Sequence, residues 1–216
     1  MLAASGTASM NPIKQESPWL HVLSWCLAVA IVGAIVGSAF ITLAALRPDP
    51  ATLQFDATDI TGVSWGRDFH LIGDDGKPHQ LADFRGKVVA LYFGYTRCPD
   101  VCPITMATLE QAVRLLDVDG ARVQTLFVTV DPRHDTPKVL TQYVRSFDKD
   151  FLGLYGDRAA IARTTAEFKV EAGEHHSIPV FLFDTSGRLR LVARPEASAA
   201  SIAHDIRLLL AQSAHS

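Results

Sequence analysis

Two cysteines four positions apart are the side chains most able to do chemistry in this sequence. Cys98 and Cys102 lie in the string Gly-Tyr-Thr-Arg-Cys-Pro-Asp-Val-Cys-Pro at residues 94–103, which opens a predicted helix. Residues at i and i+4 of a helix turn to the same side. The helix N-terminus and the neighbouring Arg97 are expected to lower the pKa of the thiols. The motif therefore predicts a partly exposed pair of thiolates.

Such a pair can form a disulfide that exchanges with other thiols, or it can bind a soft metal ion. The metal hypothesis needs a third ligand, and the string Glu-His-His-Ser-Ile-Pro at residues 174–179 provides His176 just before a predicted core strand. Two sulfurs and one imidazole nitrogen accommodate copper in both oxidation states. Structural zinc normally takes four ligands, and no further cysteine lies nearby. The residues therefore favour a copper site formed by Cys98, Cys102 and His176.

Other side chains near this chemistry have simpler interpretations. His175 is a rival third ligand, because adjacent residues entering a strand point to opposite sides. His134 is expected at the same edge of the sheet as a solvated loop residue. Asp131 and Asp135 are predicted to be turn and cap residues rather than ligands. The chain has only three cysteines, Cys26 included, so its fold must depend on the hydrophobic core rather than on disulfides.

The elements that must position these residues follow from hydrophobic periodicity. Buried strands are expected at 88–95 and 123–130, because both are nearly continuous apolar runs. Further strands are expected at 69–72, 78–81, 179–183 and 189–192, and helices at 104–116, 136–147, 158–168 and 202–210. This alternation predicts an α/β domain with a mostly parallel sheet and helices on both faces. Ligands of such sheets bind outside the carboxyl ends of the strands, where the segments after Tyr95 and Val130 are expected to meet.

An apolar segment precedes the domain. Residues 19–46 contain no Asp, Glu, Lys or Arg, and they exceed the roughly 20 residues that a helix needs to cross a bilayer. The apolar part of a cleaved signal peptide is usually shorter, about 7–15 residues. The sequence therefore predicts an N-terminal tail (1–18), an uncleaved transmembrane helix (19–46), a linker (47–62), the folded domain (63–211) and a C-terminal tail (212–216).

Charge adds little about partners or orientation. The formal net charge is −3 and the pI about 6.2, without the basic character of a nucleic-acid-binding protein. Lys14 and Arg47 flank the apolar segment on either side, so the positive-inside rule gives no orientation. The leader before Pro18 lacks arginine, which argues against a mitochondrial transit peptide and favours a bacterial source.

Three motifs together resemble one known family. They are Phe84–Pro103, Phe127–Pro137, and the His176-Ser177 pair followed by Phe-Leu-Phe-Asp at 181–184. Over residues 66–210 the chain resembles the Sco/SenC family of copper chaperones for cytochrome c oxidase. The resemblance implies a thioredoxin-like fold that binds one copper ion, Cu⁺ or Cu²⁺, through Cys98, Cys102 and His176. It also implies delivery to the dinuclear copper site of oxidase subunit II, outside the cytoplasm. Together with the apolar segment and the favoured bacterial source, this predicts a single-pass bacterial inner-membrane protein whose domain faces the periplasm.

The sequence departs from this family at two positions. The family usually has Asp before the ligand histidine, where this chain has His175, and Arg in the string Asp-Pro-x-Arg-Asp-Thr-Pro, where this chain has His134. Both changes remove a charged neighbour and add an imidazole near the expected site. The string around Pro179 also resembles the segment that carries a cis proline in thioredoxins.

The same dithiol allows other functions. The chain is expected to be a metal carrier rather than a turnover enzyme, with a thiol-disulfide reductase and a further copper carrier as additional partners. One alternative is a thiol-disulfide oxidoreductase, with Cys98 and Cys102 as its redox pair, that reduces the cysteines of the oxidase copper site. Another is a redox or copper sensor. A peroxide-reducing enzyme is disfavoured, because that family has a Thr three residues before its cysteine, whereas Thr96 is only two before Cys98.

Overall fold

The computed structural model describes residues 25, 31–35, 38, 54–170 and 178–213. The chain divides into two units, Met1–Thr52 and Leu53–Ser216. The few described residues of the first unit are helical, and no helix within the described residues is long and apolar enough to span a membrane. Most of the predicted transmembrane helix, 19–46, lies outside the described residues, so it stays a prediction.

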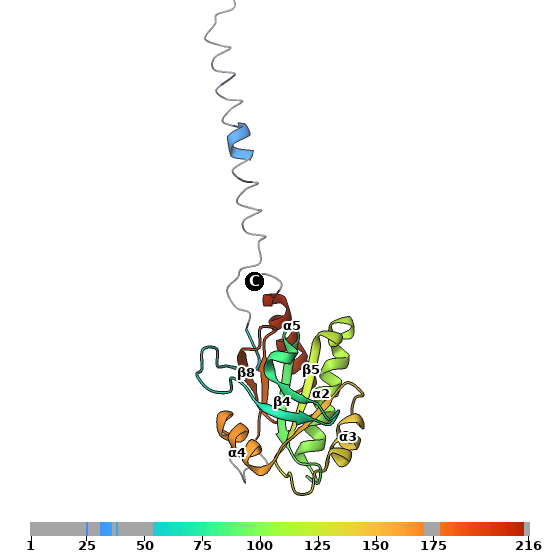
Figure 1. The fold of residues 1–216 in the computed structure, drawn as a ribbon. Coiled ribbons are helices and arrows are strands. Elements are labelled where there is room, and N and C mark those ends of the chain that lie inside the picture. The colour runs from blue at the N-terminus through green and yellow to red at the C-terminus, as the bar shows by residue number, and fades with distance from the viewer. Residues whose placement is uncertain (1–24, 26–30, 36–37, 39–53, 171–177, 214–216) are drawn as a thin grey trace, which may run out of the picture. The chain divides into compact units, whose positions relative to one another are not determined.

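The second unit is built on one eight-stranded sheet with the order β1-β8-β7-β4-β5-β6-β2-β3 (Figure 1). Its strands are β1 (Thr58–Asp59), β2 (His70–Gly73), β3 (Pro78–Gln80), β4 (Val88–Gly94), β5 (Val123–Thr129), β6 (Leu152–Tyr155), β7 (Val180–Phe183) and β8 (Leu189–Ala193). The prediction of a mostly parallel sheet is wrong. Only β4–β5 and β5–β6 pair in parallel, and the other neighbours in the described sheet are antiparallel.

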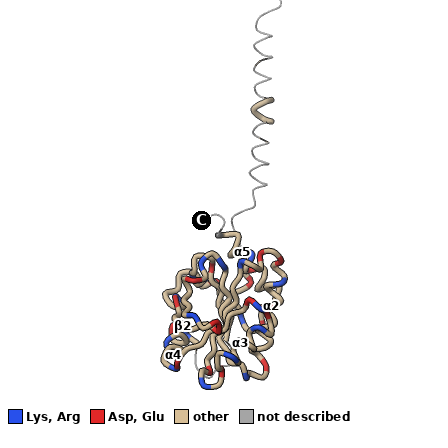
Figure 2. Tube along the Cα trace, turned by 45° about the vertical axis from the view of Figure 1, so that its right-hand side comes forward, with Lys and Arg blue, Asp and Glu red and all other residues tan. Residues whose placement is uncertain are grey.

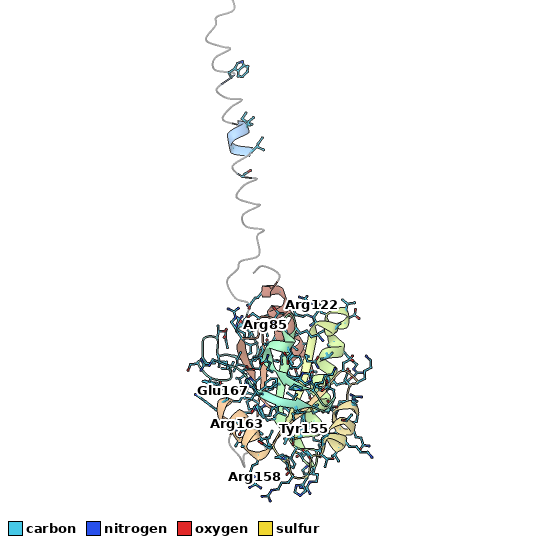
Figure 3. All side chains as sticks on the ribbon, in the orientation of Figure 1. Arg85, Arg122, Tyr155, Arg158, Arg163 and Glu167 are labelled. Carbon is cyan, nitrogen blue, oxygen red and sulfur yellow. The ribbon has the colours of Figure 1, made fainter. Side chains whose placement is uncertain are left out.

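The helices lie on both faces of this sheet, as predicted. They are α2 (Val101–Leu115), α3 (Pro137–Arg145), α4 (Arg158–Glu167) and α5 (Ala199–Ser213). On β4, Tyr92 faces Cys102 of α2, while the next residue, Phe93, packs on Phe168 at the end of α4. Because successive strand residues point to opposite faces, α2 and α4 cover opposite faces. The outer side of α4 carries exposed charged residues such as Arg158 and Arg163 (Figure 3).

The central strand is buried along its whole length. Every residue of β4, Val-Val-Ala-Leu-Tyr-Phe-Gly, is buried, as expected for a strand covered on both faces. Around the rest of the domain, Lys and Arg are interspersed with Asp and Glu (Figure 2). The apolar strand, covered by helices on both faces, therefore forms a packed base for the segment that follows Gly94.

Two helices begin at residues whose side chains cap the first turn. Thr136 accepts a hydrogen bond from the amide of Val139 at the start of α3, with Pro137 as the first helical residue. Asp157 accepts a hydrogen bond of 2.6 Å from the amide of Ala160 at the start of α4. Such caps satisfy amides that have no partner within the helix, and they explain why these helices begin where the sequence predicts.

Candidate metal centre

The two parallel central strands end side by side. Gly94 of β4 is in register with Thr129 of β5, and the amide of Val130 donates a hydrogen bond of 2.8 Å to the carbonyl of Gly94. The segments that leave these strands, 95–100 and 130–136, therefore start next to each other, as predicted for the carboxyl ends of neighbouring strands.

Both cysteines lie at this edge of the sheet. Cys98 belongs to a turn in which its amide donates to the carbonyl of Tyr95 at 3.1 Å, and Cys102 is in the first turn of α2. The amide of Cys102 donates to Sγ of Cys98 over 3.4 Å. Both are free thiols, but only 6% and 1% of their surfaces are exposed. The two cysteines lie next to each other, as predicted, whereas the predicted partial exposure is wrong because both side chains are buried.

The two thiols differ in acidity. Burial alone would raise the pKa of Cys98, but hydrogen bonds from the amides of Asp100 and Cys102 and from the side chains of Cys102 and Tyr95 lower it overall. Burial dominates at Cys102 and raises its pKa to about 12. The predicted lowering of both thiol pKa values therefore holds for Cys98 alone.

Residues of β4 shape the space around the deeper sulfur. The hydroxyl of Tyr92 lies 3.7 Å from Sγ of Cys102 and donates to it. A Cβ atom at Gly94 would lie 2.9 Å from the same sulfur and 2.8 Å from Cε2 of Phe127, both closer than real Cβ contacts. Only glycine therefore leaves room for Cys102 and Phe127 together at the end of β4.

Arg97, predicted to lower the thiol pKa values, is not among the groups that lower the pKa of Cys98, which are Asp100, Cys102 and Tyr95. Its guanidinium forms an ion pair with Asp131 over 3.1 Å, and Nδ1 of His134 lies 2.8 Å from the same carboxylate. Burial raises the pKa of Asp131, but the hydrogen bonds from His134 and Arg97 and their charges lower it below its usual value. His134 is half-exposed on the edge that carries the cysteines, as expected for a loop histidine, and its described contact is with Asp131.

Asp135 has a role that the sequence interpretation missed. It was predicted to be a turn or cap residue, but Thr136 caps α3. The carboxylate of Asp135 is buried and accepts hydrogen bonds from Thr96, which is two residues before Cys98, and from Thr129 at the end of β5. The prediction failed because Thr96 lies 39 positions from Asp135 and becomes its neighbour only when β4 and β5 align, although Thr129 is only six positions away.

The predicted histidine ligands lie outside the described residues. His175 and His176 belong to 171–177, and the description resumes at Ile178, which is buried. The bond between Ile178 and Pro179 is trans, because no cis peptide occurs among the described residues. Strand β7 then runs antiparallel to β4, with Phe181 opposite Leu91, so its first residues lie toward the end of β4 from which the cysteine segment leaves. Of the three predicted ligands, the described structure brings together Cys98 and Cys102.

Comparison with known protein families gives one match over most of the chain. The sequence profile described as SCO1/SenC matches residues 58–211. The chain is 37% identical over 175 residues to the "Protein SCO2 homolog, mitochondrial" of Bos taurus, a region covering 74% of this chain and 65% of that protein. It is 33% identical over 136 residues to a "SCO2-like protein" of Rickettsia felis, covering 62% and 66% respectively. The chain thus spans just under two thirds of the length of the bovine relative.

Solved structures show the same fold. The apo Sco1 protein of Thermus thermophilus matches with a TM-score of 0.62 and 35% identity, covering 75% of this chain and 99% of that one. The Bradyrhizobium japonicum ScoI with copper bound matches with a TM-score of 0.58 and 29% identity, covering 66% and 98%. Yeast Sco1 with copper bound matches with a TM-score of 0.62 and 25% identity, covering 71% and 95%.

Proposed function

Since this chain belongs to the SCO1/SenC family, we propose that it binds one copper ion and delivers it during the assembly of cytochrome c oxidase. The observation that carries the proposal is the pair of free thiols at the edge of the sheet, held together by the hydrogen bond from the amide of Cys102 to Sγ of Cys98. Thiolates are the ligands that copper(I) prefers. The copper-bound ScoI and yeast Sco1 structures support the same cargo.

The third ligand of the proposed site is His176. It lies two residues before Ile178, and two residues of chain span at most about 7 Å. Because β7 starts toward the end of β4 from which the cysteine segment leaves, this short connection supports an approach of the imidazole to the two sulfurs. His175 is the alternative ligand, since its side chain leaves the chain on the other side in an extended segment.

Delivery follows from the ligand set. Both thiols must lose a proton when copper binds, so copper affinity falls as the pH falls. Copper passes by stepwise exchange, in which thiolates and imidazoles of the partner replace Cys98, Cys102 and His176 one at a time. We propose the dinuclear copper site of oxidase subunit II as the acceptor. A thiol-disulfide reductase that keeps the pair reduced, and a copper carrier that loads it, complete the set of partners.

The location is part of the same proposal. Residues 19–46 anchor the chain in a bacterial inner membrane, with the domain in the periplasm. Because closely spaced thiols outside the cytoplasm tend to be oxidised, the chain must be reduced before it takes up copper. Uptake of copper(I) by the fully disulfide-bonded protein at the normal stoichiometry would contradict this requirement.

A second candidate function is favoured by the unequal thiols. In this alternative, the chain reduces a disulfide in the partner's copper site: Cys98, whose pKa is lowered, attacks as the thiolate, and Cys102 then closes the disulfide and releases the partner's two thiols. This reaction requires the dithiol but not His176. Removing the histidine therefore separates the two functions.

Copper titration of the full-length chain tests the leading proposal. The Cys26→Ser variant, reduced and kept under anaerobic conditions, is expected to bind one copper(I) per chain in competition with a chromophoric chelator. Cys98→Ser and Cys102→Ser, each added to that background, are expected to lose this binding. Tight binding of one copper by the triple variant, which lacks all three cysteines, would overturn the proposed site.

A further inference from the structure

One buried carboxylate connects the cysteine segment to the rest of the domain. Asp135 is only 2% exposed. Its Oδ2 accepts hydrogen bonds from the amide of Thr96 at 3.0 Å and from the hydroxyl of Thr129 at 2.5 Å, and its Oδ1 accepts one from the hydroxyl of Thr96 at 2.6 Å. A buried charge is costly unless it is hydrogen-bonded, and bonds to a charged group are the stronger kind. The three donors therefore fix Asp135 and are fixed by it.

The three donors come from two segments that meet only through the fold. Thr129 ends β5 and is fully buried, so it lies in the packed interior of the domain. Thr96 lies two residues beyond β4 and two before Cys98. It is part of the turn closed by the hydrogen bond from the Cys98 amide to the Tyr95 carbonyl. Through Thr96, the carboxylate therefore determines where the turn carrying Cys98 lies relative to β5.

A second link between the segments is weaker. Arg97 pairs with Asp131 across the same gap, but the side chain of Arg97 is 60% exposed, and exposed ion pairs contribute little. His134 contacts the same Asp131 and is also half-exposed. Among the described residues, Asp135 therefore provides the buried side-chain link between the cysteine turn and β5.

We propose that Asp135 is the positioning residue of the Cys98–Cys102 pair, acting through Thr96 to hold the two sulfurs in the arrangement that binds a metal ion. Asp135 contacts neither sulfur. Its role rests on the proposed copper site only where copper affinity is concerned, because the position of the thiols can be measured without metal. Supporting residues that orient metal ligands typically change metal affinity 10–100-fold when they are altered.

Four variants test this role in the full-length chain. Asp135→Asn keeps the shape but removes the charge, and Thr96→Val removes the hydroxyl donor, while Thr96→Ser keeps it. Asp184→Asn is the matched control, because Asp184 is also a buried carboxylate, 3% exposed, with bonds to Ser186, Arg188 and Arg190 at the turn between β7 and β8.

Two measurements are made on each variant. The first is the rate at which metal-free Cys102, 1% exposed, is alkylated by iodoacetamide at one fixed pH in native buffer, followed by mass spectrometry. The second is copper(I) affinity by competition with a chelator. The urea midpoint is recorded beside both, so that local loosening is distinguished from loss of overall stability.

Asp135→Asn and Thr96→Val are expected to speed alkylation of Cys102 about tenfold and to weaken copper binding 10–100-fold, with Thr96→Ser close to the parent. Asp184→Asn is expected to lower the urea midpoint and leave both site measurements unchanged. The positioning role would be overturned if Asp184→Asn changed the Cys102 alkylation rate as much as Asp135→Asn does. It would also be overturned if Asp135→Asn left that rate unchanged. If the parent bound no copper, the proposed function would fail, while the alkylation rates would still decide the role of Asp135.

Discussion

At the scale of single residues, the two cysteines of one motif are chemically different. Cys98 accepts hydrogen bonds that lower its pKa, whereas burial raises the pKa of Cys102 to about 12. The difference arises because the turn after β4 directs backbone amides at Cys98, while the first turn of α2 places Cys102 beneath Tyr92 and beside Gly94. A symmetric motif in the sequence thus becomes an asymmetric pair in the fold.

This asymmetry predicts which thiol reacts first. Alkylation requires the thiolate, and at pH 8 only about one Cys102 thiol in 10,000 is ionised if its pKa is about 12. We expect iodoacetamide to modify Cys98 at least about 100-fold faster than Cys102 at pH 8, measured by peptide mass spectrometry on the reduced protein. Equal rates at the two positions would contradict the assigned pKa directions.

The same shifts give a pH dependence of stability with a defined sign. The folded-state pKa of Cys102 is above its unfolded value of roughly 8.5. The contribution of this thiol to the free energy of unfolding is therefore fully present below about pH 8.5 and is lost as the pH rises toward 12. Cys98 has the opposite sign, because its pKa is lowered on folding. Urea unfolding of the parent and of Cys102→Ser from pH 7 to 10 therefore checks the sign of the Cys102 contribution. The difference in free energy of unfolding, parent minus variant, is expected to decrease as the pH rises.

Residue chemistry was only partly predictable from the sequence. The spacing of Cys98 and Cys102 was enough to predict that they pair, because i and i+4 contacts are local. The partner of Arg97 was not predictable, since Asp131 is 34 positions away and becomes a neighbour only when β4 and β5 align. For the same reason, Asp135 was interpreted as a cap.

At the scale of elements, the last residue of β4 is the most constrained point of the site. Gly94→Ala places a Cβ 2.9 Å from Sγ of Cys102 and 2.8 Å from Phe127. We expect a loss of about 1–3 kcal/mol in the free energy of unfolding, the usual cost of overpacking, together with weaker copper binding. Urea unfolding and chelator competition measure the two effects.

Gly120→Ala is the control for this prediction. A Cβ at Gly120 would lie 2.9 Å from the carbonyl oxygen of Val113, a similar crowding in the 3₁₀ helix that follows α2, far along the chain from the cysteines. We expect it to destabilise the domain and leave copper affinity unchanged. A Gly94→Ala variant that binds copper as tightly as the parent would show that the position of Cys102 tolerates displacement.

The elements themselves were well predicted where the pattern is long. Strands β4 and β5 and helices α2 to α5 occur where periodicity predicts them, with ends differing by a few residues. Strand β6, Leu-Gly-Leu-Tyr, was missed because four residues with a central glycine carry little strand signal, and two-residue β1 falls in the predicted linker 47–62. Helices separate the central strands β4, β5 and β6, which favours parallel pairing, but β7 and β2 join this centre antiparallel and continue into the hairpins β7–β8 and β2–β3.

At the scale of the whole molecule, a folded domain follows an apolar segment in the sequence. The chain joins the folded domain by residue 56. The amides of Asp56 and Ala57 each donate a hydrogen bond of 2.8 Å to the buried carboxylate of Asp205 in α5. The two cysteines of the proposed copper site lie at one edge of the sheet. The predicted membrane anchor and the two cysteines therefore belong to separate units of the chain, a division that the proposed function requires of a protein that delivers copper from a membrane.

The predicted tether has a direct test. If residues 19–46 span the membrane, the full-length chain is expected to stay in the membrane fraction after washing with alkaline carbonate, while a protease that cuts within 47–62 releases the domain. A matched variant with two lysines placed in the middle of the apolar segment is expected to lose membrane retention, because charges at the bilayer centre are costly. Release of the parent by carbonate would contradict the anchor.

The most direct test of the account is the set of atoms around the bound copper. X-ray absorption spectroscopy of the copper(I)-loaded Cys26→Ser chain is expected to show two sulfur neighbours and one imidazole nitrogen. His176→Ala is expected to lose the nitrogen and at least about tenfold in affinity, while His175→Ala keeps both. A His176→Ala variant with the parent's spectrum and affinity would contradict the proposal that Cys98, Cys102 and His176 form one copper site.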